Sequence, residues 1–345
     1  MTARIEEIDV HTAGEDVLRG MHKAHVDMAS DFMPEDPSPS FEFHRSGWLA
    51  PGGIHRHEQH WAAFEGDEVV GAARAVTWAD HKDSGLGVIA VRKAHRRAGV
   101  GGQLLIQCLS GLGVQDRSKL ILDLPSGSPM EPALERLGMK KALGERISRL
   151  KVADIDWDLM ENWILKAGER AEDYDLLFLE APIPDDHLEP WCRISDVMNS
   201  APLEDLELED ANMTPAKWRS VEANYEARGL DLRAYVAVHR PTGDFAGLTV
   251  LVYQRHQAWL GYQDDTGVDP VHRNKGLGRV LKSAMIKRFL QEFGDVEAID
   301  TGNAGSNEPM LNINIQMGFK PVLLVNAWQG DIATVREALG VEGLD

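Results

Sequence analysis

The chain has 345 residues, with 36 Lys and Arg against 55 Asp and Glu, so its formal net charge is −19. This length favours two domains. The acidic balance argues against a nucleic acid or an anionic membrane surface as a partner, because both are bound by basic surfaces. It is compatible with a small cationic molecule, such as an amine, which the negative field attracts.

Two further features concern the compartment. No apolar run reaches the roughly 18 residues that span a bilayer, and the acidic N-terminal segment does not resemble a signal peptide. Cys108 and Cys192 are the only cysteines and fall in different halves. A disulfide framework is therefore not expected, and we expect the protein to be cytoplasmic.

Hydrophobic periodicity predicts alternating strands and helices in the first half. An early strand precedes a helix that places Val17, Met21 and Ala24 on one face. Residues 33–60 are rich in Pro and Gly and are predicted to be mostly loop. The other predicted elements are a hairpin over 61–65 and 69–78, a strand over 86–91, a helix over 100–112, a strand over 119–124, a short helix over 132–137 and a strand over 142–152.

The second half is likewise predicted to alternate between helices and strands. The predicted elements are a helix from 154 or 156 through 166, a strand over 176–179, a helix over 187–199, an acidic loop over 200–213, a helix over 215–228, a hairpin over 232–239 and 245–253, a strand over 258–268, a helix beginning near 280, a strand over 298–301, a helix over 308–317, a strand over 319–327 and a helix over 332–339.

The stretch from Thr266 to Leu281, TGVDPVHRNKGLGRVL, predicts the end of a strand, a tight basic turn and the start of a helix. Pro270 ends the strand because it cannot donate to a ladder. Gly276 and Gly278 let the backbone turn tightly and approach a ligand closely. The first amides of the helix have no intrahelical partner and lie at the positive end of its dipole, so this turn is a predicted phosphate site. It is neither a P-loop nor a dinucleotide fingerprint.

The same pattern occurs at Ser84–Leu105, SGLGVIAVRKAHRRAGVGGQLL. Gly99 corresponds to Gly276 at an offset of 276 − 99 = 177. Further on, LERLGM at 134–139 corresponds to NIQMGF at 314–319 with an offset of 180 (318 − 138). Two landmarks with nearly equal offsets indicate an internal duplication. The predicted domains are residues 1–152 and 153–345.

Each half resembles a GNAT N-acetyltransferase, a family with an [RQ]-x-x-G-x-[GA] pyrophosphate loop. The matching loops are RRAGVG at Arg96–Gly101 and RNKGLG at Arg273–Gly278, and a later family pattern is partly present as NEPMLNINIQMGF at Asn307–Phe319. The resemblance implies an α/β fold of two tandem domains, each a mostly antiparallel sheet with a splayed central strand flanked by helices. It also implies acetyl-CoA as the cofactor and acetyl transfer to the primary amine of a small molecule by direct attack.

The resemblance further implies which residues hold the cofactor. The amide of Val268 is expected to contact the acetyl carbonyl, and the loop amides to bind the pyrophosphate. The expected cofactor-binding residues are Val268, Arg273, Asn274, Lys275, Gly276, Leu277, Gly278, Arg279 and Asn307 in the second half, and Ile89, Val91, Arg96, Arg97, Ala98, Gly99, Val100, Gly101 and Gly102 in the first.

The two halves differ in the groups that could perform the chemistry. Asp264 and Asp265 precede Val268, where this family often has its base, whereas Gly85–Val88 has no carboxylate. Asn307 matches a cofactor-contacting asparagine that is Gly127 in the first half. The second half is therefore predicted to be catalytic and the first non-catalytic or regulatory. Because strand side chains alternate, only one of the two aspartates is expected to face the site, with Asp265 favoured; a solvated acid at a strand edge is the alternative.

The general acid is not evident. Asn314 stands where the family usually has a tyrosine, and an asparagine cannot supply a proton. Water or Tyr262 then protonates the leaving group, or the step needs no acid. No metal is expected.

Three alternatives stay open: both halves catalytic, a mycothiol-synthase-like enzyme acting on a cysteinyl sugar, or a non-catalytic acyl-CoA-binding module. The acceptor amine and the oligomeric state, monomer or homodimer, are not determined by the sequence.

Overall fold

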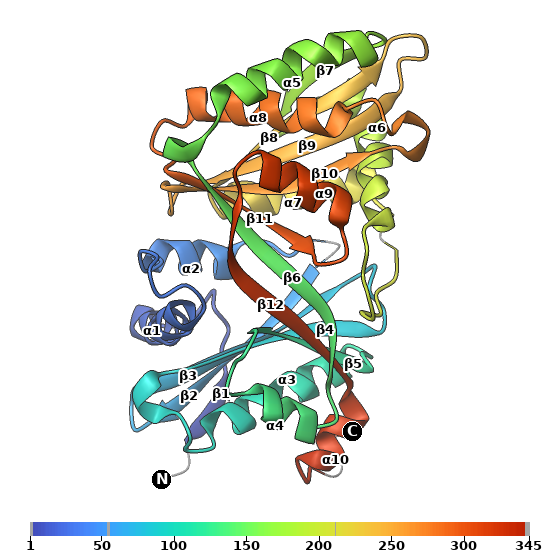
Figure 1. Cartoon of the computed structure of the whole chain (residues 1–345). Helices are drawn as coiled ribbons and strands as arrows, with labels where there is room; N and C mark the ends of the chain where they lie inside the picture. Colours follow the sequence, from blue (N-terminus) through green and yellow to red (C-terminus); the bar gives the residue numbers. More distant parts are fainter. Residues whose placement is uncertain (1–2, 54–55, 211, 342–345) are drawn as a thin grey trace. The chain divides into compact units, whose positions relative to one another are not determined.

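The computed structural model describes residues 3–53, 56–210 and 212–341, without the side chains of 167–170. Two compact units make up this part of the chain (Figure 1). The first contains residues up to 144, 203–210 and those from 323 onward, and the second contains 145–202 and 211–322. The expected fold class is confirmed: both units are mixed α/β, with mainly antiparallel sheets flanked by helices.

The first unit has the strand order β1-β2-β3-β4-β5-β12, in which only the pairing of β4 with β5 is parallel. Its elements are β1 (Arg4–Glu7), α1 (Glu15–Phe32), α2 (Phe41–Leu49), β2 (Arg56–Glu65), β3 (Glu68–Trp78), β4 (Ser84–Val91), α3 (Val100–Val114), β5 (Lys119–Pro125), α4 (Glu131–Arg136), β12 (Lys320–Asp331) and α10 (Ile332–Ala338).

The second unit has the order β6-β11-β10-β9-β8-β7, in which only β10 and β11 are parallel. Its elements are β6 (Lys140–Lys151), α5 (Trp157–Arg170), β7 (Tyr174–Glu180), α6 (Asp185–Ser195), α7 (Pro215–Ala227), β8 (Leu230–His239), β9 (Phe245–Gln254), β10 (Leu260–Val268), α8 (Leu277–Glu292), β11 (Ala298–Ala304) and α9 (Glu308–Gln316).

Alternating side chains bury both faces of the sheets. On β2, Trp61 and Ala63 belong to the core cluster under α3, whereas Ala62 and Phe64 belong to the cluster under α1. Successive strand residues point to opposite faces, so helices cover both sides. In the second unit α8 carries Phe289, which is fully buried against the sheet. Burying a side chain of this kind contributes about 1.5–3 kcal/mol.

One predicted loop contains a helix. Residues 33–60 include α2 and the first residues of β2, which the high Pro and Gly content had disfavoured. Ser40 caps α2 by accepting a hydrogen bond from the Phe43 amide at 3.1 Å, as an N-cap serine does. Trp48 anchors the helix, since it is only 5% exposed. The helix therefore depends on a cap and a single buried anchor, which give a weak periodic signal.

Each unit contains residues from the other half of the sequence. Residues 325–331 of β12 pair antiparallel with β5 in the first unit, and residues 145–151 of β6 pair antiparallel with β11 in the second. The segment 203–210 belongs to the first unit, where Glu207 pairs with Lys119 and Glu209 accepts hydrogen bonds from the amides of Lys82 and Asp83. A single boundary at residue 152 therefore does not describe how the sequence is divided between the units.

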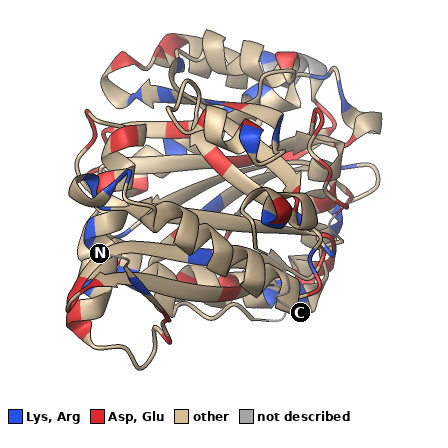
Figure 2. Cartoon of the chain, turned by 90° about the horizontal axis from the view of Figure 1, so that it is seen from below, with Lys and Arg blue, Asp and Glu red and all other residues tan. Residues whose placement is uncertain are grey.

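Acidic and basic residues are interspersed over the helices and strands (Figure 2). No helix among the described residues is long and apolar enough to cross a membrane.

Candidate functional site

The central strand of each unit separates from its parallel neighbour part of the way along. In the second unit β10 pairs with β11 only from Leu260 to Tyr262, yet it stays paired with β9 as far as Val268. In the first unit β4 pairs with β5 only from Ser84 to Gly87, while its pairing with β3 continues to Val91. Both units therefore have the splayed strand that the family resemblance implied, and in each the glycine turn follows the unpaired end of that strand.

A cavity of about 180 Å³ lies in the opening of the second unit. One wall is β10, another is the end of β11 with the start of α9, and a third is α8. The lining residues are Glu145, Met198, Tyr262, Gln263, Asp264, Asp265, Thr266, Lys282, Thr301, Gly302, Asn303, Asn307 and Met310.

Asp264 and Asp265 both line this cavity, so the prediction that only one of them faces the site is wrong. The reason is an irregularity in the ladder: the register of β10 against β9 shifts between Gln263 and Thr266. A bulge interrupts the strict alternation of a strand and re-aims the side chains within it. The sequence alone does not reveal a bulge of this kind.

The irregular segment is held by a buried amide. Gln263 is 1% exposed, and its Nε2 donates to the Val250 carbonyl at 2.5 Å and to Thr249 Oγ1 at 3.1 Å. Thr249 and Thr266 hydroxyls are 2.9 Å apart. The Gln263 side chain therefore anchors the irregular segment to β9, and Asp264 and Asp265 line the cavity beside it.

The environment of the aspartates favours their protonated forms. Burial raises the pKa of Asp264, and burial together with the negative charge of Asp264 raises the pKa of Asp265. The two carboxyl groups titrate as a pair, so the raised values belong to the pair. Burial and the same two carboxylates raise the pKa of Tyr225 on α7, which keeps this hydroxyl neutral. Such a carboxyl pair in a cavity is a candidate for proton transfer near neutral pH.

Tyr262 and Asn314 occupy different positions. Tyr262 lines the cavity and is 41% exposed; burial of its hydroxyl, with Asp264 nearby, raises its pKa. Asn314 is fully buried on α9 and does not line the cavity. Its Nδ2 donates to Asn303 Oδ1 at 2.7 Å. Asn303 lines the cavity, so Asn314 supports a lining residue but does not itself reach the cavity.

Lys282 lines the same cavity and was not predicted as a site residue. It lies on α8 between Leu281 and Met285, is 1% exposed, and its ammonium lies 5.5 Å from the centre of the Phe319 ring. Burial lowers the pKa of Lys282 to about 7. The signal in the sequence was a lysine within an apolar helix face, where the corresponding residue of the first half is Leu105.

The two glycine turns have matching backbones. Gly276 and Gly99 are left-handed, at φ +82° and +86°, and each precedes the first residue of a helix. Asn274 and Arg97, two residues before them, are also left-handed. Nothing lies within 4 Å of where a Cβ would stand on either glycine. The requirement for glycine is therefore one of conformation, and the space above each turn is open.

Each turn presents free amides in the part of the chain that the structure describes. The backbone amides from Asn274 to Gly278, and from Arg97 to Gly102, donate no hydrogen bond to a described residue. The Asp269 amide donates to Ala246 on the β9 side at 2.9 Å. Because successive amides of a strand point to opposite edges, the amide of Val268 points toward the opening. The Arg92 amide donates to Val70 at 2.9 Å, so the same holds for Val91.

The charges beside the two turns differ. Arg273 contacts the neutral hydroxyl of Ser200 at 3.1 Å, whereas Arg96 forms an ion pair with Asp31 at 2.7 Å. Lys275 lies 5.3 Å from the centre of the Tyr174 ring, and Arg279 donates to Gln316 at 3.1 Å. Asn307 accepts a hydrogen bond from the Met310 amide at 3.4 Å and lines the cavity. The second turn thus has more uncompensated positive charge.

The remaining expected residues lie on or beside the first turn. Ile89 and Val91 belong to β4, which pairs with β3 at these positions. Ala98 precedes Gly99, and Val100, Gly101 and Gly102 form the first turn of α3. A Cβ on Gly101 would lie 3.7 Å from Val91, an ordinary contact.

These observations test whether the turns fit a diphosphate. Unpaired amides in consecutive left-handed and helical conformations at a helix N-terminus form a concave anion site. Both turns have this geometry, and in the second the charges of Arg273 and Lys275 are not paired with a carboxylate among the described residues, whereas Arg96 of the first is paired with Asp31. The residues present therefore fit the pyrophosphate of acetyl-CoA.

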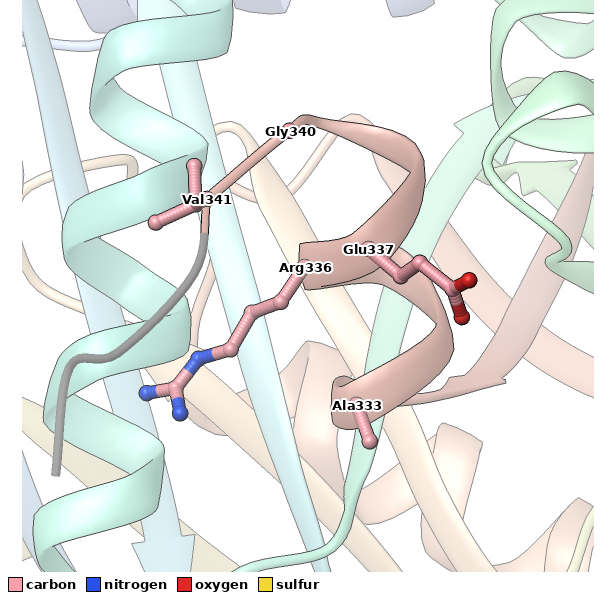
Figure 3. Close-up of a pocket in the computed structure, with 5 residues that line it drawn as sticks. All are labelled: Ala333, Arg336, Glu337, Gly340 and Val341. Carbon is pink, nitrogen blue, oxygen red and sulfur yellow. The ribbon is translucent and has the colours of Figure 1, made fainter.

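A second hollow lies at the end of the described chain (Figure 3). Its lining residues all come from α10 and the residues after it, and Arg336 points away to donate to the Leu109 carbonyl on α3 at 3.2 Å. Its lining contains no pair of acidic residues like Asp264 and Asp265, which line the cavity beside β10. Among the described residues, no cluster of His, Cys, Asp and Glu is arranged to hold a metal ion.

Comparison with known proteins agrees with this geometry. Residues 22–122 match the model of the Acetyltransferase (GNAT) family. No curated protein matches the chain.

Solved structures resemble the chain over nearly its full length. A tandem GNAT protein from the clavulanic acid biosynthesis pathway, solved without AcCoA, is 20% identical, with 96% of this chain and 98% of that chain covered and a TM-score of 0.77. A GCN5-related N-acetyltransferase from Sphaerobacter thermophilus is 11% identical, with 96% of both chains covered and a TM-score of 0.67. A glucosamine N-acetyltransferase region of a fungal multi-domain GH3 β-N-acetylglucosaminidase is 13% identical, with 96% of this chain and 38% of that chain covered and a TM-score of 0.65. At these identities the likeness concerns the fold.

Proposed function

We propose that this tandem GNAT protein is an acyltransferase that uses acetyl-CoA to acetylate the primary amine of a small molecule, and that the catalytic site is in the second half. Three features of the second unit carry this proposal: a splayed strand, a cavity in its opening lined by a half-buried pair of carboxyl groups, and a turn of unpaired amides that follows the strand in the chain. Acetyl-CoA, when bound, supplies the acetyl group as an activated thioester.

The residues of the second half divide the work. The amides from Asn274 to Gly278 bind the diphosphate, with Arg273 and Lys275 adding charge. The amide of Val268 polarises the acetyl carbonyl. Asp264 and Asp265 accept the proton that the amine must lose before or during attack. Their raised pKa lies closer to the working pH, and a general base is most efficient when its pKa is near that pH.

The same carboxyl groups favour a cationic acceptor. Asp264, Asp265 and Glu145 line the cavity with Tyr262. An ammonium group in the cavity would be attracted to these acids, and an aromatic side chain can contact a cation through its face. The cavity volume of about 180 Å³ suits a small amine or the end of a longer one.

For the first half we propose acyl-CoA binding without catalysis. Its turn has the same left-handed residues and unpaired amides, but β4 carries no carboxylate from Ser84 to Val91. The Arg96 charge is also paired with Asp31. The first half would then regulate or stabilise the second.

Both cysteines are free and buried, which supports a reducing compartment such as the cytoplasm.

The test has two parts. Calorimetry with acetyl-CoA is expected to give tight binding that Gly276→Val weakens strongly. Release of the CoA thiol is then followed with a panel of primary amines, and Asp264→Asn/Asp265→Asn is expected to lower kcat while acetyl-CoA still binds. Absence of acetyl-CoA binding to the wild type would refute the proposal. A stoichiometry of two per chain, falling to one in Gly99→Val, would establish binding by the first half.

A further inference from the structure

Lys282 is a buried, unpaired amine in the proposed catalytic cavity. The side chain is 1% exposed and lines the cavity together with Asn303 and Asn307. Among the described residues, no carboxylate lies within 4.0 Å of its ammonium and no group accepts a hydrogen bond from it; the ammonium lies over the Phe319 ring, 5.5 Å from the ring centre. An ammonium buried without a counter-ion costs several kcal/mol, so a purely structural role is poorly served by a lysine here.

The first half shows what packing alone requires. The residue at the corresponding position is Leu105, which is 5% exposed in the core cluster under α3. The position on the helix therefore accepts an apolar side chain in the same fold. The half that has the carboxyl pair has the lysine, and the half that has no such carboxyl group has the leucine.

Lys282 also lies on the side of the cavity where the leaving group would be. It is on α8, whose first turn carries the amides that fit the diphosphate, and α8 adjoins α9, since a Cβ on Gly278 would lie 3.6 Å from Ile313. The usual position of a proton donor, on α9, is occupied by Asn314, which does not line the cavity. The carboxyl pair is on a different wall, β10.

We propose that Lys282 is the proton donor to the departing sulfur, a role that rests on the acetyltransferase function proposed above. As the N–C bond forms and the C–S bond breaks, the electron pair of the C–S bond leaves on sulfur. Before attack the ammonium substrate loses one proton to solvent, which gives the free amine. During transfer Lys282 Nζ donates one proton to that sulfur, and the Asp264–Asp265 pair accepts the second proton from the nitrogen. The carboxyl pair then returns this proton to Lys282, directly or through solvent, so the net reaction releases one proton for each ammonium acetylated.

Two further observations support this role. The lowered pKa of Lys282, about 7, gives a group that can release its proton at neutral pH, in contrast to an exposed lysine. The charged and titratable groups that face the cavity from other elements are Glu145, Tyr262, Asp264 and Asp265. Because Glu145 and each ionised member of the Asp264–Asp265 pair carry negative charge, a carboxylate on the substrate would be repelled there, and Lys282 is poorly placed to serve as an anchor for an anion.

The deciding experiment uses CoA alone. The ionisation of the bound CoA thiol is titrated by its ultraviolet absorbance in the wild type, in Lys282→Met and in Lys287→Met. Lys287 is the matched control, because it lies on the same helix, 42% exposed and paired with Glu161 at 2.8 Å. The thiol pKa is expected to be about one unit lower in the wild type and in Lys287→Met than in Lys282→Met. Equal values in all three would overturn the proposal.

Rate measurements add a second readout where an amine acceptor is found. Lys282→Met is expected to lower kcat about a hundredfold, within the range for general acid catalysis, and to remove the loss of rate at alkaline pH. Thermal unfolding at pH 6 checks folding, since removing the unpaired charge is expected to raise Tm. If the wild type does not bind CoA or acetyl-CoA, the proposed function fails. If it binds and Lys282→Met behaves like the wild type, only the role of Lys282 fails.

Discussion

Arg273 Nε donates a hydrogen bond to the carbonyl oxygen of Val268 at 3.0 Å. This contact ties the end of the splayed strand to the amide turn, and Arg96 makes the same contact with Val91 at 3.0 Å in the first half. The first residue of both glycine turns is therefore an arginine for a reason visible in the backbone: its guanidinium fixes the strand end and adds positive charge beside the unpaired amides.

Replacing this arginine should weaken cofactor binding more in the second half than in the first. Arg273→Ala is expected to raise the Kd for acetyl-CoA on the order of tenfold, as expected for loss of a charged hydrogen-bonding group. Arg96→Ala should have a smaller effect on binding, because the charge of Arg96 is already paired with Asp31. Calorimetry on both variants checks this. A larger effect of Arg96→Ala would contradict the assignment of the second half as the main site.

Alanine at the turn glycines should separate backbone strain from binding. Gly276→Ala and Gly243→Ala both place a Cβ at positive φ with nothing within 4 Å, so each should lose about 1–2 kcal/mol of stability. Only Gly276→Ala should also weaken acetyl-CoA binding, because Gly243 lies in the turn between β8 and β9. Urea unfolding and calorimetry measure the two quantities. Weakened binding by Gly243→Ala would show that strain alone lowers affinity.

The carboxyl pair should make stability fall as the pH rises. The ordinary pKa of an aspartate is 3.8, and in the folded protein both values are raised. Between the unfolded and folded values the folded state binds more protons, so the free energy of unfolding decreases with increasing pH through this window.

Asp265→Asn should remove part of this loss. Relative to the wild type, the variant should gain on the order of 1–2 kcal/mol at pH 8 and nothing near pH 4, since one pKa unit corresponds to about 1.4 kcal/mol. Urea unfolding at pH 4, 6 and 8 measures this, with Asp295→Asn at an exposed position as the control. If the free energies of unfolding of the wild type and the variant change in parallel with pH, the raised pKa of Asp265 is contradicted.

The ion pair between β6 and β11 should be essential as a pair. Arg149 Nε and Nη2 donate to Asp300 at 2.7 and 2.8 Å, and the side chains are 11% and 8% exposed. Asp300→Ala leaves a buried charge and is expected to lower stability by about 3–5 kcal/mol. The double variant Arg149→Met/Asp300→Leu should recover most of the lost stability. Urea unfolding of the single and the double variant measures this. A small effect of Asp300→Ala would show that the Arg149 guanidinium becomes hydrated when its partner is removed.

The local parts of the structure were predictable and the non-local parts were not. The turn at Gly276 follows from local rules, because a left-handed residue before a helix calls for glycine. The order of strands and helices followed from periodicity in the same way. By contrast, Asp264 and Asp265 share one cavity only because the ladder shifts beside Gln263, and that shift depends on Thr249 and Val250 of a neighbouring strand.

Lys282 shows a second limit. Its neighbours Leu281 and Met285 mark an apolar helix face, and a lysine near such a face is ordinarily explained by a charged end that reaches solvent. Its burial depends on how α8 packs near Phe319, which lies far along the sequence. Comparing it with Leu105 would have singled it out, because the duplication supplies an internal reference.

The pairing of β12 with β5 has a consequence for biosynthesis. Val325 lies opposite Pro125 and Asp331 opposite Lys119, so the sheet of the first unit is completed by residues that are translated about 200 positions later, at an elongation rate of roughly 5–20 residues per second. During that interval β5 has an unpaired edge, the kind of surface to which other chains add. A ribosome-bound nascent chain halted before residue 320 would therefore expose the edge of β5 that β12 covers in the folded protein, a surface that chaperones protect.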